Sequence, residues 1–297
     1  MPMRSAYLCV ILIWSTTPLA SQWSMQSDFL FALTARLSIG AVVAMVMIVL
    51  MRREVEWHRK ALAGYTIAGG TLCLAMGAMY WAMQYIPSGW VSVLFGLSPI
   101  ITAVLAWMFL DEGRVNLQSQ AGILFGFLAL FLIFSSSLNF TPESSAGVAV
   151  AVFSTFTHAA SAVWLKRLQP VKSALVLSTG GMLVAVPILI IVGSFLGTDW
   201  TPSLSLREVS AIIYLGVIAS AIGFSLYYFV LRNVSATRVS LITQITPVVC
   251  LILGSWLNNE PLVANVWIGT ALISFGLLMF ELSQRRLVGP NKAAPRT

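Results

Sequence analysis

Apolar residues along the chain come in stretches of about 20, and short polar breaks separate them. A helix of that length crosses a hydrocarbon core of ~30 Å. We therefore predict an all-α polytopic membrane protein whose loops are too short for a further folded domain. The pattern predicts ten transmembrane helices: Ser5 to Ser21, Phe29 to Met51, Ala61 to Met83, Gly89 to Leu110, Gln118 to Ser135, Gly147 to Leu165, Ala174 to Leu196, Val209 to Leu231, Ala236 to Leu257 and Val263 to Leu282.

The composition agrees with a membrane protein. Of 297 residues, 58% are apolar and 9% are charged, whereas soluble domains are about 25% charged. Cys9, Cys73 and Cys250 all fall inside predicted spans, which argues against a disulfide framework. The first span also has the basic flank and apolar run of a signal peptide. We interpret it as a helix because the repeat described below needs it.

The distribution of basic residues predicts the orientation of the chain. The formal net charge is +7, but we predict no nucleic-acid partner because the positive loops fit a topology signal. Lys and Arg collect on the cytoplasmic side of membrane proteins. With both termini in the cytoplasm, 15 of the 17 Lys and Arg lie inside, leaving Arg207 outside and Arg36 within a helix. We predict a multi-pass protein of the bacterial inner membrane in this orientation.

The two halves of the chain resemble each other at an offset of 148 residues, which pairs Tyr80 with Tyr228 and Pro99 with Pro247. Each half holds five predicted helices. Because five is odd, the two copies must lie upside down relative to each other, an arrangement that recurs in secondary transporters. We predict two inverted five-helix repeats and a cytoplasmic tail: residues 1–137, 138–285 and 286–297.

The matched prolines suggest where a substrate would bind. Pro99 and Pro247 lie near the middle of the fourth and ninth spans, and each disturbs the turn before it. Irregular backbone at membrane depth needs protein or a water-filled cavity to satisfy it. Matched interruptions therefore indicate a midplane binding site, although kinks that serve packing alone remain an alternative.

Small and polar residues line one face of each of these two helices. Ser92 shares a face with Pro99 in the fourth span, and Ser240 and Gln244 share a face with Pro247 in the ninth. Small residues at this spacing also serve close helix packing. Gln244 stands out because an amide at membrane depth needs a partner, and a substrate could provide one.

Aromatic residues occur at both ends of the predicted cavity. Tyr80 and Trp81 lie close to the outer mouth, and Tyr228 lies close to the inner mouth. Two aromatic clusters related by symmetry would suit alternating gates. The alternative is that they anchor the helices at the membrane interface.

Two ionisable residues within spans are further candidates. His158 lies on a polar stripe of the sixth span with Trp164 one turn after Ser161, and it could exchange a proton during transport. A neutral histidine that donates to a neighbouring helix is the alternative. Arg36 could hold an anionic group such as a carboxylate, or it could extend to the outer headgroups.

The chain resembles the EamA family of the drug/metabolite transporter superfamily. The residues that carry the resemblance are WSTTP at Trp14 to Pro18, Arg36, the stretch from Tyr80 to the FLDE ending at Glu112, and a weaker copy ending at Glu260. The resemblance implies ten helices around a central cavity, alternating access, and often export of amino acids or other metabolites, as in YddG-type exporters of aromatic amino acids. It adds Trp14 to the predicted substrate contacts.

Three classes of function compete. A carrier of small metabolites fits best, with export of amino acids, including aromatic ones, as the expected activity. An intramembrane enzyme has few candidate residues, because the chain has two histidines and no paired carboxylates within spans. A receptor or scaffold without flux, or an importer of another solute, stays open. We predict no catalytic residue, metal or cofactor, and a monomer or homodimer that binds a small-molecule substrate and the lipid bilayer.

The predicted spans also limit how transport could be powered. No Asp or Glu lies in the middle of any span, which argues against a proton relay built on carboxylates. The remaining alternatives are coupling through His158 and passive export driven by the substrate gradient.

Overall fold

The computed structural model describes residues 3–110, 117–135, 141–240 and 242–258, together with four two-residue pieces between 268 and 279. These residues form helices and contain no strand. The elements are α1 (Met3–Ser24), α2 (Phe29–Leu50), α3 (Arg59–Thr71), η1 (Leu72–Met76), α4 (Gly77–Ala82), α5 (Ser88–Phe95), α6 (Ser98–Phe109), α7 (Leu117–Ser135), α8 (Pro142–Leu168), α9 (Ala174–Leu196), α10 (Leu206–Tyr214), η2 (Leu215–Ile222), α11 (Gly223–Asn233), α12 (Ala236–Ser240) and α13 (Ile242–Asn258).

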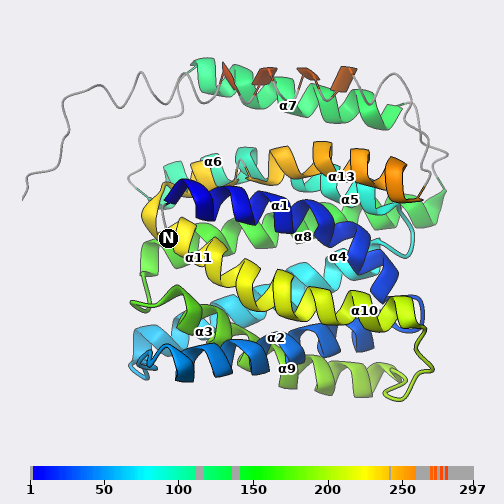
Figure 1. The fold of residues 1–297 in the computed structure, drawn as a ribbon. Helices are drawn as coiled ribbons and strands as arrows, with labels where there is room; N and C mark the ends of the chain where they lie inside the picture. Colours follow the sequence, from blue (N-terminus) through cyan, green and yellow to red (C-terminus); the bar gives the residue numbers. More distant parts are fainter. Residues whose placement is uncertain are drawn as a thin grey trace, which may run out of the picture.

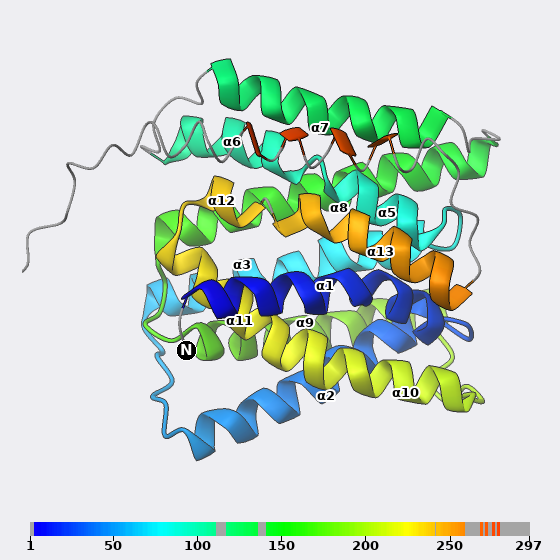
Figure 2. The ribbon, with the colours of Figure 1, turned by 45° about the horizontal axis from the view of Figure 1, so that its top comes forward.

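The long helices run side by side along one direction and form a bundle (Figure 1). Figures 1 and 2 both place α7 along one edge of the bundle and α2 toward the opposite edge. α9 packs against α2, α3 and α11, while α1 packs against α11 and α13. α8 packs against α3, α4 and α6. These contacts bring helices from the two halves of the sequence together.

Within the described residues, six helical segments are long and apolar enough to cross a membrane. They are Phe29–Leu50, Arg59–Ala82, Trp90–Phe109, Pro142–Leu168, Ala174–Leu196 and Leu206–Asn233. The described residues are therefore all in helices and loops, and the chain is a multi-pass membrane protein. The ten-helix count and the inverted repeat are not established by these six segments.

The other four predicted spans are not among these six segments, for separate reasons. α1 is as long as α2 but carries the polar run Ser15 to Thr17 and is not among the six. The described apolar part of α7, Gln120–Ala129, is shorter than a span. The ninth is represented by α12 and the 17-residue α13, and most of the tenth, like Glu112, Glu260 and the tail, lies outside the described residues.

Polar side chains cap the helices that begin at one end of the bundle. The carboxylate of Asp28 accepts from the backbone N–H groups of Leu30 and Phe31 at the start of α2. Ser205 and Glu208 form a reciprocal capping box at the start of α10. Because each cap satisfies N–H groups that the helix leaves unpaired, short loops can connect neighbouring helices.

Pro99 and Pro247 affect their helices differently. The fourth span is divided into α5 and α6, and the break at Gly96 and Leu97 comes just before Ser98 and Pro99, which begin α6. A proline fits the first turn of a helix because no N–H is needed there. Pro247 instead lies inside α13, which continues through it.

Candidate functional site

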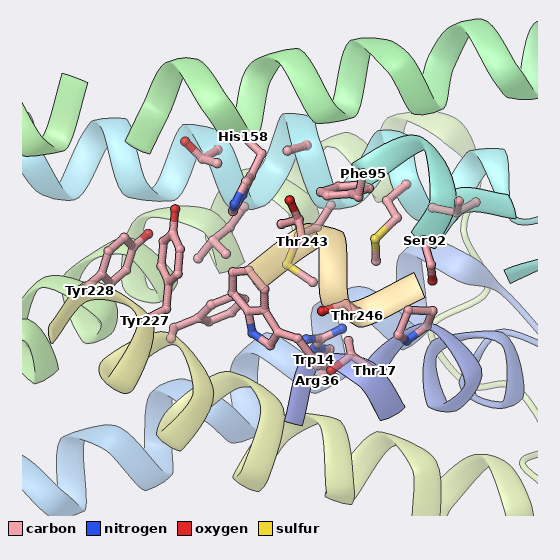
Figure 3. Close-up of a pocket in the computed structure, with 18 residues that line it drawn as sticks. Trp14, Thr17, Arg36, Ser92, Phe95, His158, Tyr227, Tyr228, Thr243 and Thr246 are labelled. Carbon is pink, nitrogen blue, oxygen red and sulfur yellow. The ribbon is translucent and has the colours of Figure 1, made fainter. Parts of the chain in front are cut away.

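A cavity of about 100 Å³ lies inside the bundle (Figure 3). By the same measure one water molecule needs about 10–15 Å³, so the cavity has room for a small metabolite. α1, α2, α3, η1, α4, α5, α8, α11 and α13 all contribute to its walls. The lining residues are Trp14, Thr17, Pro18, Arg36, Thr71, Leu72, Ala75, Met76, Met79, Val91, Ser92, Phe95, His158, Phe224, Tyr227, Tyr228, Thr243 and Thr246.

Aromatic rings form one wall of the cavity. The ring of Trp14 lies 4.8 Å from that of Tyr227 and 5.6 Å from that of His158, measured between centroids. His158 also lies 5.8 Å from Phe95, and Tyr227 lies 5.3 Å from Tyr228. These separations are typical of attractive ring contacts. The wall therefore presents stacked, mostly apolar surface to whatever occupies the cavity.

Arg36 supplies the positive charge of the cavity, and its side chain is only 1% exposed. Its Nε donates to the hydroxyl oxygen of Ser220 at 2.9 Å. Its Nη1 donates to the hydroxyl oxygens of Ser21 at 3.3 Å and Tyr80 at 3.2 Å. The side chain therefore stays in the bundle and does not extend to the headgroups, the alternative that the sequence left open.

Close packing of α2 against η2 brings Arg36 and Ser220 together. Gly40, one turn after Arg36, faces Ser220, and a Cβ at Gly40 would lie 2.8 Å from the Cβ of Ser220. A Cβ at Gly216 would lie 3.1 Å from the carbonyl oxygen of Arg36. Because neither glycine carries a side chain, the two backbones approach closely enough for Ser220 to accept from Arg36.

The lining set contains no Asp or Glu among the described residues. The described acidic residues lie in loops, at caps or in first helical turns: Asp28, Glu54, Glu56, Glu143, Asp199 and Glu208. Apart from Arg36, His158 and the indole N–H of Trp14, the polar side-chain groups of this set are hydroxyls. Those of Thr17, Ser92 and Thr246 donate to carbonyl oxygens of their own helices, so their oxygens remain available as acceptors.

The structure brings five of the predicted substrate contacts to the cavity: Trp14, Arg36, Ser92, His158 and Tyr228. Tyr80 is fully buried behind Arg36. The ring of Trp81 instead contacts that of Tyr85 at 4.6 Å. Pro99 and Pro247 are buried in their helices but are not among the lining residues.

Trp164 lies away from the cavity, although the sequence placed it beside the substrate. Its side chain is 46% exposed and its ring contacts that of Phe109 at 5.3 Å. Trp164 follows His158 by six residues, which turns it about 240° around α8, so the two side chains cannot share a face. The side chains of Ser240 and Gln244 lie outside the described part of the structure.

Sequence reasoning missed several lining residues, among them Thr17, Pro18, Phe95, Thr243 and Thr246. A signal for two of them was present, because the offset of 148 that relates the halves pairs Phe95 with Thr243. Pro18 belongs to the same motif as Trp14 and lies one turn after it. The missed residues are apolar or carry common hydroxyl groups, and such residues do not stand out within an apolar span.

The chain is a bundle of helices with a cavity inside it, and the comparison with known proteins identifies its family. The EamA-like transporter family matches residues 4–135 and 145–282. The chain belongs to this family.

Several curated relatives match nearly the whole chain. The uncharacterized transporter YoaV of Bacillus subtilis is 26% identical over 94% of this chain and 97% of its own length. The uncharacterized inner membrane transporter YedA of Escherichia coli K12 is 24% identical over 99% of this chain and 95% of its own length. A crystal structure of a protein with 20% identity superposes with a TM-score of 0.77 and covers 95% of this chain and 99% of that one; it supports the fold alone.

Proposed function

We propose that the chain is a secondary transporter that carries a small metabolite through the cavity by alternating access. The observation that carries this proposal is a cavity lined from both halves of the chain. A cavity with apolar and aromatic walls and a few polar groups is typical of small-molecule binding. Membership of a transporter family makes carriage more plausible than a receptor or scaffold role.

The lining residues support the inverted repeat of residues 1–137 and 138–285. At the offset of 148, Met76 pairs with Phe224 and Met79 with Tyr227, and all four line the cavity. The two π-helical segments, η1 and η2, also occur in corresponding spans of the two halves. π-Helical turns are frequent at functional sites. A site shared by two inverted halves is reachable from either face of the membrane.

The placement of charge supports an inner-membrane protein with both termini in the cytoplasm. Lys166 on α8 binds the end of α11, and the backbone N–H of Lys172 binds Glu56 in the α2–α3 loop. These contacts gather the basic loops at the end of the bundle where α1 begins (Figure 1). At the opposite end, Glu208 accepts from Ser27. The basic end would face the cytoplasm under the positive-inside rule.

Export of small metabolites such as amino acids, including aromatic ones, is the proposed activity. The aromatic wall around Trp14 and Tyr227 supports a substrate with an apolar or aromatic body. No described carboxylate lies in the cavity, so a proton relay built on carboxylates is not part of the proposal. Energy would come from the substrate gradient or from a proton exchanged at His158.

Counterflow in proteoliposomes tests the proposal. Vesicles containing the purified protein are loaded with one candidate solute, and uptake of the labelled solute is followed. Tyr227→Ala should slow uptake about tenfold, because it removes a ring from the cavity wall. Tyr85→Ala, which removes an exposed ring outside the cavity, is the matched control. Absence of counterflow for every solute in a broad panel would favour the receptor or scaffold alternative.

A further inference from the structure

The donor groups of Arg36 are only partly satisfied by the protein. Nε and both hydrogens of Nη1 are used by Ser220, Ser21 and Tyr80. A guanidinium has five N–H donors, so the two on Nη2 have no acceptor within the described part of the chain. Figure 3 shows the Arg36 guanidinium beside Trp14 and Thr246 at the cavity. Because Arg36 is among the residues that line the cavity, these two N–H donors are free to bind a substrate there.

The charge of Arg36 is also unbalanced. Its three acceptors are neutral hydroxyl groups, and none of the described lining residues is acidic. A buried charge without an opposite charge is strongly unfavourable, and ionisable groups at membrane depth usually have a functional partner. A carboxylate matches a guanidinium in both charge and planar geometry. An anionic substrate would thus supply the negative charge that the described residues do not place beside Arg36.

The same arrangement disfavours a positively charged group close to the bound carboxylate. Like charges a few ångströms apart repel strongly away from water, and an α-ammonium would lie near Arg36. Hydroxyl oxygens such as those of Thr17 and Thr246 could accept from an ammonium, but they carry no formal charge to balance it. We therefore expect the site to favour a carboxylate without an ammonium over a complete amino acid.

We propose that the cavity binds a monoanionic carboxylate with an apolar or aromatic body and no adjacent ammonium, with the carboxylate on Nη2 of Arg36 and the body against Trp14 and Tyr227. This inference rests on the proposed carriage of a small metabolite, and within that function it favours a carboxylate that lacks the α-ammonium over an amino acid. The cavity of about 100 Å³ limits the body to a single ring or a short chain.

Three probes that share a phenylethyl skeleton test the proposal: 3-phenylpropionate, L-phenylalanine and phenethylamine. Binding of labelled 3-phenylpropionate to the full chain in nanodiscs is measured, with the other two as competitors. We expect 3-phenylpropionate to bind at least tenfold more tightly than L-phenylalanine and phenethylamine not to compete. Arg36→Gln should weaken 3-phenylpropionate binding at least tenfold. Arg53→Gln, which removes the same charge from an exposed loop residue, should leave binding unchanged.

Each contrary outcome has a distinct meaning. Binding of L-phenylalanine equal to or tighter than that of 3-phenylpropionate, unchanged binding by a folded Arg36→Gln variant, or no binding of 3-phenylpropionate would overturn the anion site. If Arg36→Gln does not fold, the ranking of the three probes on the unmodified protein still decides. Flux of L-phenylalanine with no selective binding of 3-phenylpropionate would overturn the anion site and support transport. Binding of 3-phenylpropionate without counterflow would support the site and contradict transport.

Discussion

The phenol oxygen of Tyr80 lies 3.2 Å from Nη1 of Arg36 and accepts a hydrogen bond from it, although the two residues are 44 positions apart. Tyr80 is fully buried and comes from α4, whereas Arg36 comes from α2. Ser21 and Ser220 accept from the same guanidinium. Three neighbouring elements thus fix the position of one buried cation, and Tyr80 acts through Arg36.

Tyr80→Phe should destabilise the protein without changing the volume of the cavity. The change removes one acceptor from a buried cation, and a hydrogen bond to a charged group contributes about 1.5–3 kcal/mol. We expect a lower midpoint for thermal unfolding in detergent at a fixed scan rate. Tyr85→Phe is the control, because Tyr85 is 41% exposed and the structure shows no bond to its hydroxyl among the described residues. Equal unfolding midpoints for the two variants would mean that the Tyr80 hydrogen bond contributes no stability.

The features that sequence predicted correctly depend on composition and chain order. Long apolar stretches predicted the six helical segments that are long and apolar enough to cross a membrane, and a charge inside such a stretch marked Arg36 as unusual whatever its surroundings. Pro99 was expected to disturb the fourth span, and the helix does break at Gly96 and Leu97, immediately before Ser98 and Pro99. These inferences need no knowledge of how one helix sits against another.

The features that sequence did not predict depend on helix rotation and on partners from distant segments. Trp164 was predicted to share a face with His158, but it lies about 240° further around α8, where its exposed ring contacts Phe109. Tyr80 was expected to screen the outer mouth, and its contact with Arg36 required the relative placement of α2 and α4. Ser220 became a partner only because Gly40 lets α2 approach η2.

Lys166→Met should loosen the junction between α11 and α12. The Nζ of Lys166 donates to the carbonyl oxygens of Leu231, Arg232 and Val234 at 2.9, 2.9 and 2.7 Å. These carbonyls lie at a helix C-terminus, where a cation is favourable. Hydrogen–deuterium exchange of residues 231–236 should speed up severalfold. Arg167→Met, an exposed neighbour on the same helix, should leave exchange there unchanged; the same acceleration in both variants would rule out a specific role for the ammonium.

Glu56 should make stability depend on pH through the contact between the α2–α3 loop and the loop that precedes α9. The backbone N–H of Lys172 donates to its carboxylate at 2.7 Å. This bond, with smaller contributions from His58 and the Lys172 charge, lowers the pKa of Glu56 below its ordinary value of 4.5. A lowered folded-state pKa contributes stability above pH 4.5 that is lost as the pH falls through the folded-state value.

Glu56→Gln should therefore flatten part of the acid limb of a plot of melting temperature against pH. The effect should be small because the group is near the surface. Glu54→Gln, an exposed carboxylate two residues away with no bond among the described residues, serves as the control. If the two variants give the same acid limb, the Lys172 contact is not the cause.

Single cysteines in a cysteine-free background should report the orientation of the bundle. Glu54→Cys lies in the α2–α3 loop at the basic end, and Asp199→Cys lies in the α9–α10 loop at the other end. The positive-inside rule predicts that a membrane-impermeant maleimide labels Asp199→Cys in intact cells and labels Glu54→Cys only after the membrane is opened. Labelling of Glu54→Cys in intact cells would reverse the topology and remove the main support for both termini being cytoplasmic.

Transport of a monoanion should respond to the membrane potential. Moving one elementary charge through 100 mV changes the free energy by about 2.3 kcal/mol, and an interior-negative potential drives an anion outward. Efflux of 3-phenylpropionate from loaded proteoliposomes should therefore rise severalfold when a potassium gradient and valinomycin make the interior negative. Protein-free vesicles measure leakage of the acid, and the Arg36→Gln variant should show leakage alone. Equal efflux with and without the potential would contradict unaccompanied anion movement, and the proton carrier to test would then be His158, which faces the same cavity.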